Sequence, residues 1–189
     1  MNKIRLKLIL IIILSITSTY IYCQDKSETF KTKTDDFISK TGTIIKFIDY
    51  IPSYLRTKYG NCNTKVRKIT NGSNTPLYVY QIINESQNIS RVASIEYSDL
   101  IEVIKAFEVL KSDAMKDYLS QNYLENKFIS KDGFQIGYYV SNNSVVWYLK
   151  LEKFGTTNNT VFLDDISYVE TSFLNAKNKI EELINNEKL

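Results

Sequence analysis

The chain has 189 residues, with 24 basic side chains, 21 acidic side chains and no histidine, so its formal net charge is +3. The absence of histidine excludes Cys–His and Ser–His–Asp catalysis and every zinc site that needs a histidine ligand. The lysines and arginines form no concentrated run, which argues against the basic face that nucleic-acid binding requires, and we expect no nucleic-acid partner.

Residues 1–23 have the pattern of a secretory signal peptide, in which a basic start precedes an apolar run at 8–14 and a more polar stretch. The apolar run is shorter than the about 20 residues of a membrane-spanning helix. We therefore expect membrane contact only through this segment before its cleavage. Lipoprotein anchoring at Cys23 is not expected, because the lipoprotein peptidase needs a small side chain at the preceding position, which is Tyr22.

Cleavage after Cys23 removes three basic residues and no acidic ones, which leaves a neutral mature chain. The about 166 remaining residues suit one domain with its own core. We divide the chain into the signal peptide, a loose polar leader at 24–35 and a single domain at 36–189. Cys62 is then the sole cysteine, so an intramolecular disulfide is excluded although the destination is periplasmic or extracellular. We expect it to be an inert, partly buried side chain in a loop.

The first part of the domain predicts two hairpins and a short helix. Glycine- and asparagine-containing turns separate its apolar runs, and Pro52 can occupy the first turn of a helix that stops at Gly60. The expected elements are strands at 37–40 and 43–50, a helix at 53–59, and strands at 64–70 and 77–83.

Residues 91–111 change their hydrophobic period in the middle. The stretch up to Tyr97 alternates between two faces, as a strand does, and from Ser98 onward apolar residues recur every three or four positions. We predict a strand followed by a helix that Ser98 caps. Asp99 would lie in its first turn, where a negative charge meets the positive end of the helix dipole.

The second part of the domain predicts a further hairpin and a terminal helix. Asp132-Gly133 is the strongest short hairpin signal in the chain, and Asn142-Asn143 predicts the next turn. The expected elements are strands at 127–131, 134–141, 145–152 and 160–163, and a helix at about 165–186.

The strand-to-helix pattern of residues 91–111 returns 66 residues later. One duplicated unit, with halves at about 64–118 and 126–186, is the simplest interpretation. A competing similarity between 37–42 and 128–133 is interpreted as two similar turns. The matched pairs are Ile95 with Val161, Tyr97 with Leu163, Ser98 with Asp164, Leu100 with Ile166, Val103 with Val169, and Phe107 with Phe173.

Hairpins followed by helices predict an α+β fold, with an antiparallel sheet and two amphipathic helices on one face. Each half would supply three strands and a helix, and the two halves could share one sheet. A closed barrel is the alternative arrangement.

Four tyrosines form the candidate binding surface: Tyr78, Tyr80, Tyr139 and Tyr148. They fall on one parity of their strands, whereas Trp147 and its apolar neighbours fall on the other. If Trp147 faces the helices, the tyrosines face outward, where flat rings with hydroxyls suit a sugar ring or a protein partner. Cross-strand packing is the alternative explanation.

Catalytic and cofactor motifs are lacking: the sequence has no nucleophile elbow, phosphate-binding loop, calcium loop or paired-cysteine metal motif. The adjacent carboxylates Asp164 and Asp165 are explained by helix capping. Glycosidase chemistry needs two carboxylates that face each other across roughly 5 to 9 Å, and the linear sequence identifies no such pair. We expect no metal, no cofactor and no enzymatic activity.

Two segments, YSDLIEVIKAFEVLKS and NKFISKDGFQIGYYVSNNSVVWYLKLEKFG, together with the signal peptide, resemble a group of small exported proteins of Bacteroidota without an assigned function. The resemblance covers 36–183 and implies export but no activity. We expect an exported envelope or secreted protein with a binding or accessory domain whose partner is a protein or a glycan. The alternatives are a carboxylate-based hydrolase and a carrier of lipids or small hydrophobes.

Overall fold

The computed structural model describes residues 30–72, 75–86, 89–155 and 157–187, apart from the side chains of three of them, and the chain from Lys31 onward forms one compact unit. The predicted signal peptide and residues 24–29 of the predicted leader lie outside the described residues. None of the described helices combines the length and hydrophobicity of a transmembrane segment. In chain order the elements are α2 (Lys33–Ile38), β1 (Lys46–Thr57), β2 (Gly60–Thr70), β3 (Leu77–Ser86), β4 (Ile89–Glu96), α3 (Tyr97–Asp117), β5 (Leu124–Ile129), β6 (Gln135–Ser141), β7 (Ser144–Lys150), β8 (Thr160–Leu163) and α4 (Ser167–Asn186).

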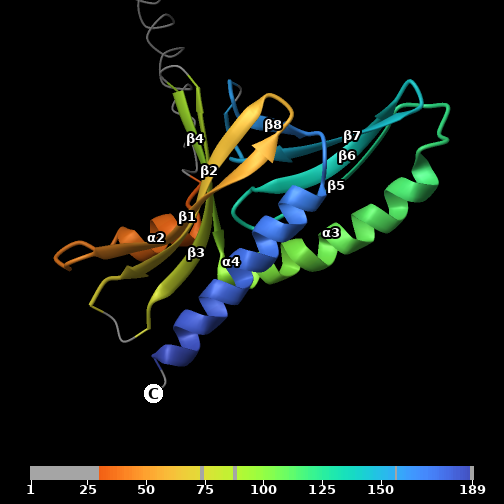
Figure 1. Ribbon diagram of the computed structural model, residues 1–189. Helices are drawn as coiled ribbons and strands as arrows, with labels where there is room; N and C mark the ends of the chain where they lie inside the picture. The colour runs from red at the N-terminus through yellow and green to blue at the C-terminus, as the bar shows by residue number, and fades with distance from the viewer. Residues whose placement is uncertain (1–29, 73–74, 87–88, 156, 188–189) are drawn as a thin grey trace, which may run out of the picture. The chain divides into compact units, whose positions relative to one another are not determined.

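The fold is α+β, as predicted, and all strand pairing is antiparallel. The strands form two four-stranded sheets with the simple orders β1-β2-β3-β4 and β5-β6-β7-β8, and each sheet is followed in the chain by one long helix (Figure 1). A single sheet shared by both halves is therefore wrong, and each half has one strand more than expected. The reason is that α3 carries the chain away from β4 before β5 begins, so β5 starts a new sheet.

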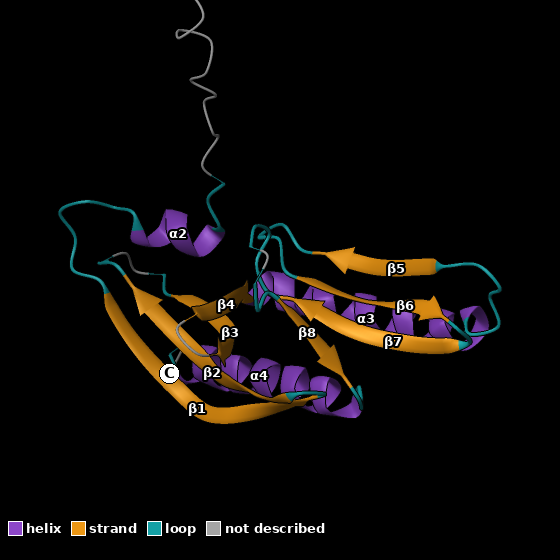
Figure 2. Cartoon of the chain, turned by 90° about the horizontal axis from the view of Figure 1, so that it is seen from above, coloured by secondary structure: helices purple, strands orange, loops and turns teal. Residues whose placement is uncertain are grey.

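The two long helices pack crosswise between the halves. Helix α3 follows the first sheet but also packs on β5 and β6 of the second, and α4 follows the second sheet but packs on β1 and β2 of the first. Figure 2 shows α4 beside β1 and β2, and α3 along the second sheet. The helices also contact each other, so one core joins both sheets.

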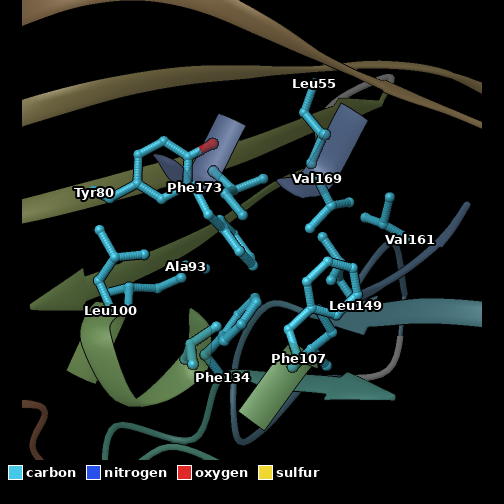
Figure 3. Packing of buried hydrophobic residues seen from close by; sticks show 14 of the residues in the cluster. Leu55, Tyr80, Ala93, Leu100, Phe107, Phe134, Leu149, Val161, Val169 and Phe173 are labelled. Atoms are coloured by element: carbon cyan, nitrogen blue, oxygen red, sulfur yellow. The ribbon is translucent and has the colours of Figure 1, made fainter. Parts of the chain in front are cut away.

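The buried stripes of the two helices match at the spacing of 66 residues. Phe107 and Phe173 are both about 1% exposed, and their ring centroids lie 6.3 Å apart in an edge-to-face arrangement (Figure 3). Rings from both sheets complete this cluster, since Trp147 packs on Phe107 and Tyr80 on Phe173. The matched buried pairs are Val103 with Val169, Phe107 with Phe173, Leu110 with Ala176, and Ala114 with Ile180.

The predicted strand at 37–40 is wrong, because residues 33–38 form helix α2. Thr32 caps this helix: its hydroxyl accepts from the backbone N–H of Asp35, whose carboxylate in turn accepts from the N–H of Thr32. This reciprocal arrangement is a capping box. The Phe37 carbonyl accepts a hydrogen bond from the side-chain amide of Asn71 at the end of β2.

The predicted helix at 53–59 is also wrong, because β1 continues to Thr57. The β1–β2 register shifts between Tyr50 and Ser53, so the strand contains a bulge at the position of Pro52. A proline lacks the N–H that a ladder needs, and a bulge is one of the few places in a sheet that accept it. The bulge allows β1 to continue past Pro52, at which the sequence pattern predicted the start of a helix.

The caps of the long helices differ from those predicted. Helix α3 begins at Tyr97 without a side-chain cap, and Ser98 lies inside its first turn together with Asp99. Helix α4 begins at Ser167, whose backbone N–H donates to the carboxylate of Asp165 at 2.8 Å. Asp165 therefore satisfies one free N–H at the start of α4, as capping predicts for the acidic pair, and Asp164 lies further out.

Candidate functional site

The four predicted tyrosines do not form one exposed surface. Tyr78 and Tyr80 are 6% and 2% exposed and face α4, where Tyr80 bonds to Ser172. The prediction that these two tyrosines face outward is wrong, because both faces of β3 are covered. Val79, on the opposite parity, is also fully buried, since α2 contacts β3 and β4. When both parities are apolar, the alternation in the sequence cannot tell which face meets the long helix.

Tyr139 and Tyr148 do lie on the face of the second sheet that points away from the core residues Tyr138 and Trp147. Their rings are 6.5 Å apart, and Tyr139 stacks on Tyr123 at 6.1 Å. Tyr148 is nevertheless only 7% exposed. The three rings cover one another, which is the cross-strand packing that was the alternative explanation.

A hydrogen bond ties this row of rings to the edge of the sheet. The Tyr148 hydroxyl donates to a carboxylate oxygen of Glu125 on β5 at 2.5 Å. Burial, and then this carboxylate, raise the pKa of Tyr148 above its ordinary range. Gly137 lies opposite Tyr148 in the β6–β7 ladder, where a Cβ atom would approach the Asn126 carbonyl to 2.6 Å. The ring thus fills space beside a position that accepts only glycine.

One hollow lies between the β1–β2 hairpin and α4 and has a volume of about 260 Å³. We call it the hairpin groove. Hydroxyl and amide side chains dominate its wall, and no carboxylate is among the described residues that line it. The lining residues are Ser53, Tyr54, Arg56, Asn61, Thr64, Lys65, Val66, Tyr80, Tyr168, Thr171, Ser172, Asn175 and Ala176.

The floor of the hairpin groove is a buried pair of hydroxyls. The Tyr80 hydroxyl and the Ser172 hydroxyl lie 2.5 Å apart, and Thr64 beside them is 4% exposed. Burial raises the pKa of Tyr80 to about 12, although hydrogen bonds from Ser172 and Thr64 lower it. The phenol therefore remains neutral at physiological pH and can donate and accept hydrogen bonds.

The mouth of the hairpin groove holds a guanidinium beside an aromatic ring. Arg56 lies 5.5 Å from the centroid of the Tyr168 ring and donates to the Tyr168 hydroxyl at 3.2 Å. Within the described residues, no salt bridge joins Arg56 to a carboxylate. Lys65, the other cation of the wall, is paired with Asp49 at 2.8 Å. Asp165 lies near Arg56 in the adjoining hollow, and the pKa of Asp165 is lowered by its hydrogen bonds with Ser167 and by the charge of Arg56. Of the two cations of the groove wall, Arg56 is the better placed to meet an anionic group of a ligand.

Three carboxylates converge elsewhere, on Lys33 of α2. The Lys33 ammonium lies 2.6 Å from Asp99 and 3.1 Å from Glu96, and its backbone N–H donates to both oxygens of Asp132. Burial raises the pKa of Asp132, and the negative charges of Asp99 and Glu96 raise it further. The backbone hydrogen bond from Lys33 opposes this shift without reversing it. These acids dock α2 onto the start of α3 and the β5–β6 turn, and the ammonium pairs with Asp99 and Glu96. No acidic cluster in the described part of the chain has the arrangement of a metal site.

Cys62 lies in β2 rather than in a loop and is 1% exposed. Burial raises the pKa of its thiol to about 11. The thiolate needed for nucleophilic attack is therefore scarce at neutral pH, and the sulfur is out of reach of a second chain.

A second hollow of about 370 Å³, lined mostly by apolar side chains, lies between α3, β7 and the start of α4. Trp147 and Ala114 form its buried wall, whereas Met115 is 72% exposed at its rim. The hollow is open to solvent along α3.

The chain matches no protein-family model, no curated protein and no solved structure. The hairpin groove was not predicted, because its residues come from β1, β2, β3 and α4 and share no sequence motif. The available signal was the density of hydroxyl and amide side chains at 53–64 and 168–175, which is visible only when the two segments are known to be neighbours.

Proposed function

We propose that this protein is an exported, non-enzymatic binding domain, and that its hairpin groove binds an acidic glycan. The observation that carries the proposal is the lining of the groove, where hydroxyl and amide side chains surround one arginine beside an exposed tyrosine ring. Export is inferred from the signal-peptide pattern of residues 1–23.

Sugar rings need both polar and flat apolar partners. The hydroxyls of Tyr80 and Ser172 and the amide of Asn175 can exchange hydrogen bonds with sugar hydroxyls. Tyr54 and Tyr168, which are 72% and 40% exposed, offer ring faces on which the apolar face of a sugar can stack. These groups supply both kinds of contact within one hollow.

The charge of the groove favours an acidic sugar over a neutral one. Arg56 has a planar fork of donors that matches a carboxylate or a sulfate, and Tyr168 holds it at the mouth of the groove. No carboxylate is among the described residues of the groove wall, and Asp164 and Asp165 lie in the adjoining hollow beside Arg56. Uronic-acid oligosaccharides are therefore the ligand class that we expect.

The test is calorimetric titration of the full protein with an oligogalacturonate and, in parallel, with a neutral cello-oligosaccharide of equal length. We expect binding of the acidic oligomer, with a loss of about tenfold or more in affinity for Arg56→Gln because a charge-assisted bidentate contact disappears. Lys105→Gln, a matched change at an exposed residue of α3, should leave affinity unchanged.

Absence of binding to the acidic oligomer, or equal binding by wild type and Arg56→Gln, would contradict the proposal. Equal affinity for the acidic and neutral oligomers would show that Arg56 does not select the ligand. Hydrolysis of either oligomer by the wild-type protein would refute the non-enzymatic part.

A further inference from the structure

Strand β5 (Leu124–Ile129) is an edge strand of the second sheet. It pairs with β6 along its whole length, and among the described strands the order ends with it. Helix α3 also packs on the strand. Figure 2 shows β5 as the outermost strand of its sheet, with no other ribbon beyond it. Backbone N–H and C=O groups along such an edge can pair with another strand.

The side chains of this edge are complementary to themselves when the strand is reversed. Glu125 and Lys127 lie on the face away from α3, with side chains 33% and 37% exposed and 3.2 Å apart. Tyr123 and Ile129, at the two ends on the same face, are 69% and 53% exposed. Asn126 lies midway between each of these two pairs in the sequence.

We propose that β5 pairs antiparallel with β5 of a second copy of this chain, about a two-fold axis at Asn126. In that register Glu125 of each copy lies opposite Lys127 of the other, and Tyr123 lies opposite Ile129. The second sheet (β5–β8) of one copy then continues across the axis into the second sheet of the other copy, which gives one sheet of eight strands. The interface is the same surface on both copies, as a two-fold dimer requires.

Charge favours this register over the two registers with the axis at a neighbouring residue. Strands related by an axis perpendicular to the sheet keep the same faces, so the axis must pass through a residue of β5. An axis at Glu125 sets that carboxylate against its own copy, and an axis at Lys127 sets two ammonium groups face to face. Like charges directly opposite destabilise a strand pair. The axis at Asn126 replaces both clashes with two Glu–Lys pairs.

The second face of the strand fits the same register. Leu124 and Phe128, which pack against the core from the α3 side, would lie opposite each other across the axis. Both faces then have apolar or oppositely charged partners. This complementarity distinguishes β5 from an edge whose lysine only deters pairing.

The test uses sedimentation equilibrium to measure the molecular mass of the full chain. The protein is purified from the cells that express it and is measured across a broad concentration range. We expect a monomer–dimer equilibrium. Glu125→Lys and Lys127→Glu should each weaken it about tenfold or more, because each places two like-charged pairs across the axis. The double variant Glu125→Lys/Lys127→Glu should restore dimerisation, since it reverses both charges and keeps them opposite.

The restoration separates pairing from stability. Glu125→Lys also removes the acceptor of the Tyr148 hydroxyl, and this bond remains lost in the double variant. Recovery of the dimer can then come only from the contact between copies. Glu102→Lys, a matched reversal at an exposed residue of α3, should dimerise like the wild type. A monomer at every concentration, or single variants that dimerise as tightly as the wild type, would overturn the proposal.

Discussion

Lys33 is the residue on which the docking of α2 depends. Its ammonium lies 2.6 Å from Asp99, which is 2% exposed and has one carboxylate oxygen without a partner among the described residues. Glu96 supplies a second contact. Burial lowers the pKa of Lys33, but the hydrogen bonds and charges of Asp99 and Glu96 outweigh it, so the pKa is raised. The Lys33 ammonium thus adds an ionic contact to the backbone hydrogen bonds that link α2 to Asp132 and Asn71.

Replacement of Lys33 by methionine should lower the free energy of unfolding by about 2 kcal/mol, because the buried Asp99 carboxylate loses its counter-charge. The value lies below the range for fully buried pairs because the lysine side chain is 33% exposed and water screens the pair. Urea denaturation of the full chain measures this loss.

The control is a double variant in which Asp99, the partner of Lys33, is also made neutral. Lys33→Met/Asp99→Asn should recover most of the lost stability, since an amide tolerates the site without a counter-ion. Lys31→Met, an exposed change two residues away, should have little effect. Strictly additive losses for Lys33→Met and Asp99→Asn would show that the two residues do not interact energetically.

At the scale of elements, the long helices use equivalent residues for equivalent contacts. Phe107→Ala and Phe173→Ala should each cost about 3 to 5 kcal/mol, because both rings are fully buried in the shared core. Val109→Ala and Leu174→Ala, at exposed positions of the same helices, should change stability by less than about 0.5 kcal/mol. Thermal and urea unfolding check both pairs. A loss below about 1 kcal/mol at either phenylalanine would contradict the equivalence.

Local pattern was sufficient to predict the long helices and most of the hairpins. The change of period near Ser98, the Asp132-Gly133 turn and the Asn142-Asn143 turn are each encoded within a few residues, and both asparagines have positive φ angles of 51° and 56°. Pro52 misled the prediction because its acceptance depends on a bulge that two strands form together. The capping box of α2 was visible from Thr32 onward but was overlooked.

The candidate site depended on information that adjacent residues do not contain. The orientation of Tyr80 follows from α2, which covers the other face of β3, and the position of Tyr168 follows from α4, which packs on the first sheet. The bond of Tyr80 to Ser172 spans 92 residues of sequence, and the bond of Arg56 to Tyr168 spans 112. Strand parity alone was correct only for the second sheet, where Tyr139 and Tyr148 lie away from the core.

At the scale of the whole molecule, the two halves share one core. Helix α4 packs on β1 and β2, and α3 packs on β5 and β6 as well as on β3 and β4 of its own half, so each sheet is covered in part by the helix of the other half. Side-chain bonds follow the same crossing: Lys111 of α3 pairs with Glu170 of α4 at 3.0 Å, and Tyr97 bonds to Glu181 at 2.9 Å.

Separately produced fragments 31–120 and 121–189 should therefore fail to unfold cooperatively, because each exposes an apolar sheet face and an apolar helix stripe. Mixing them should restore a cooperative transition and the near-ultraviolet circular dichroism of the intact chain. An intact chain cut once between residues 120 and 121 is the matched control. Cooperative unfolding of either fragment alone would show that a half is self-sufficient.

The crossing of the helices also sets an order in time. Because α4 follows every described strand in the chain, the face of β1 and β2 that it covers stays bare until residues 167–186 have been synthesised. A nascent chain emerging from the ribosome therefore cannot close its fold early. Such a delay would suit the export that we propose, because a polypeptide stays unfolded while it is threaded through a translocation channel.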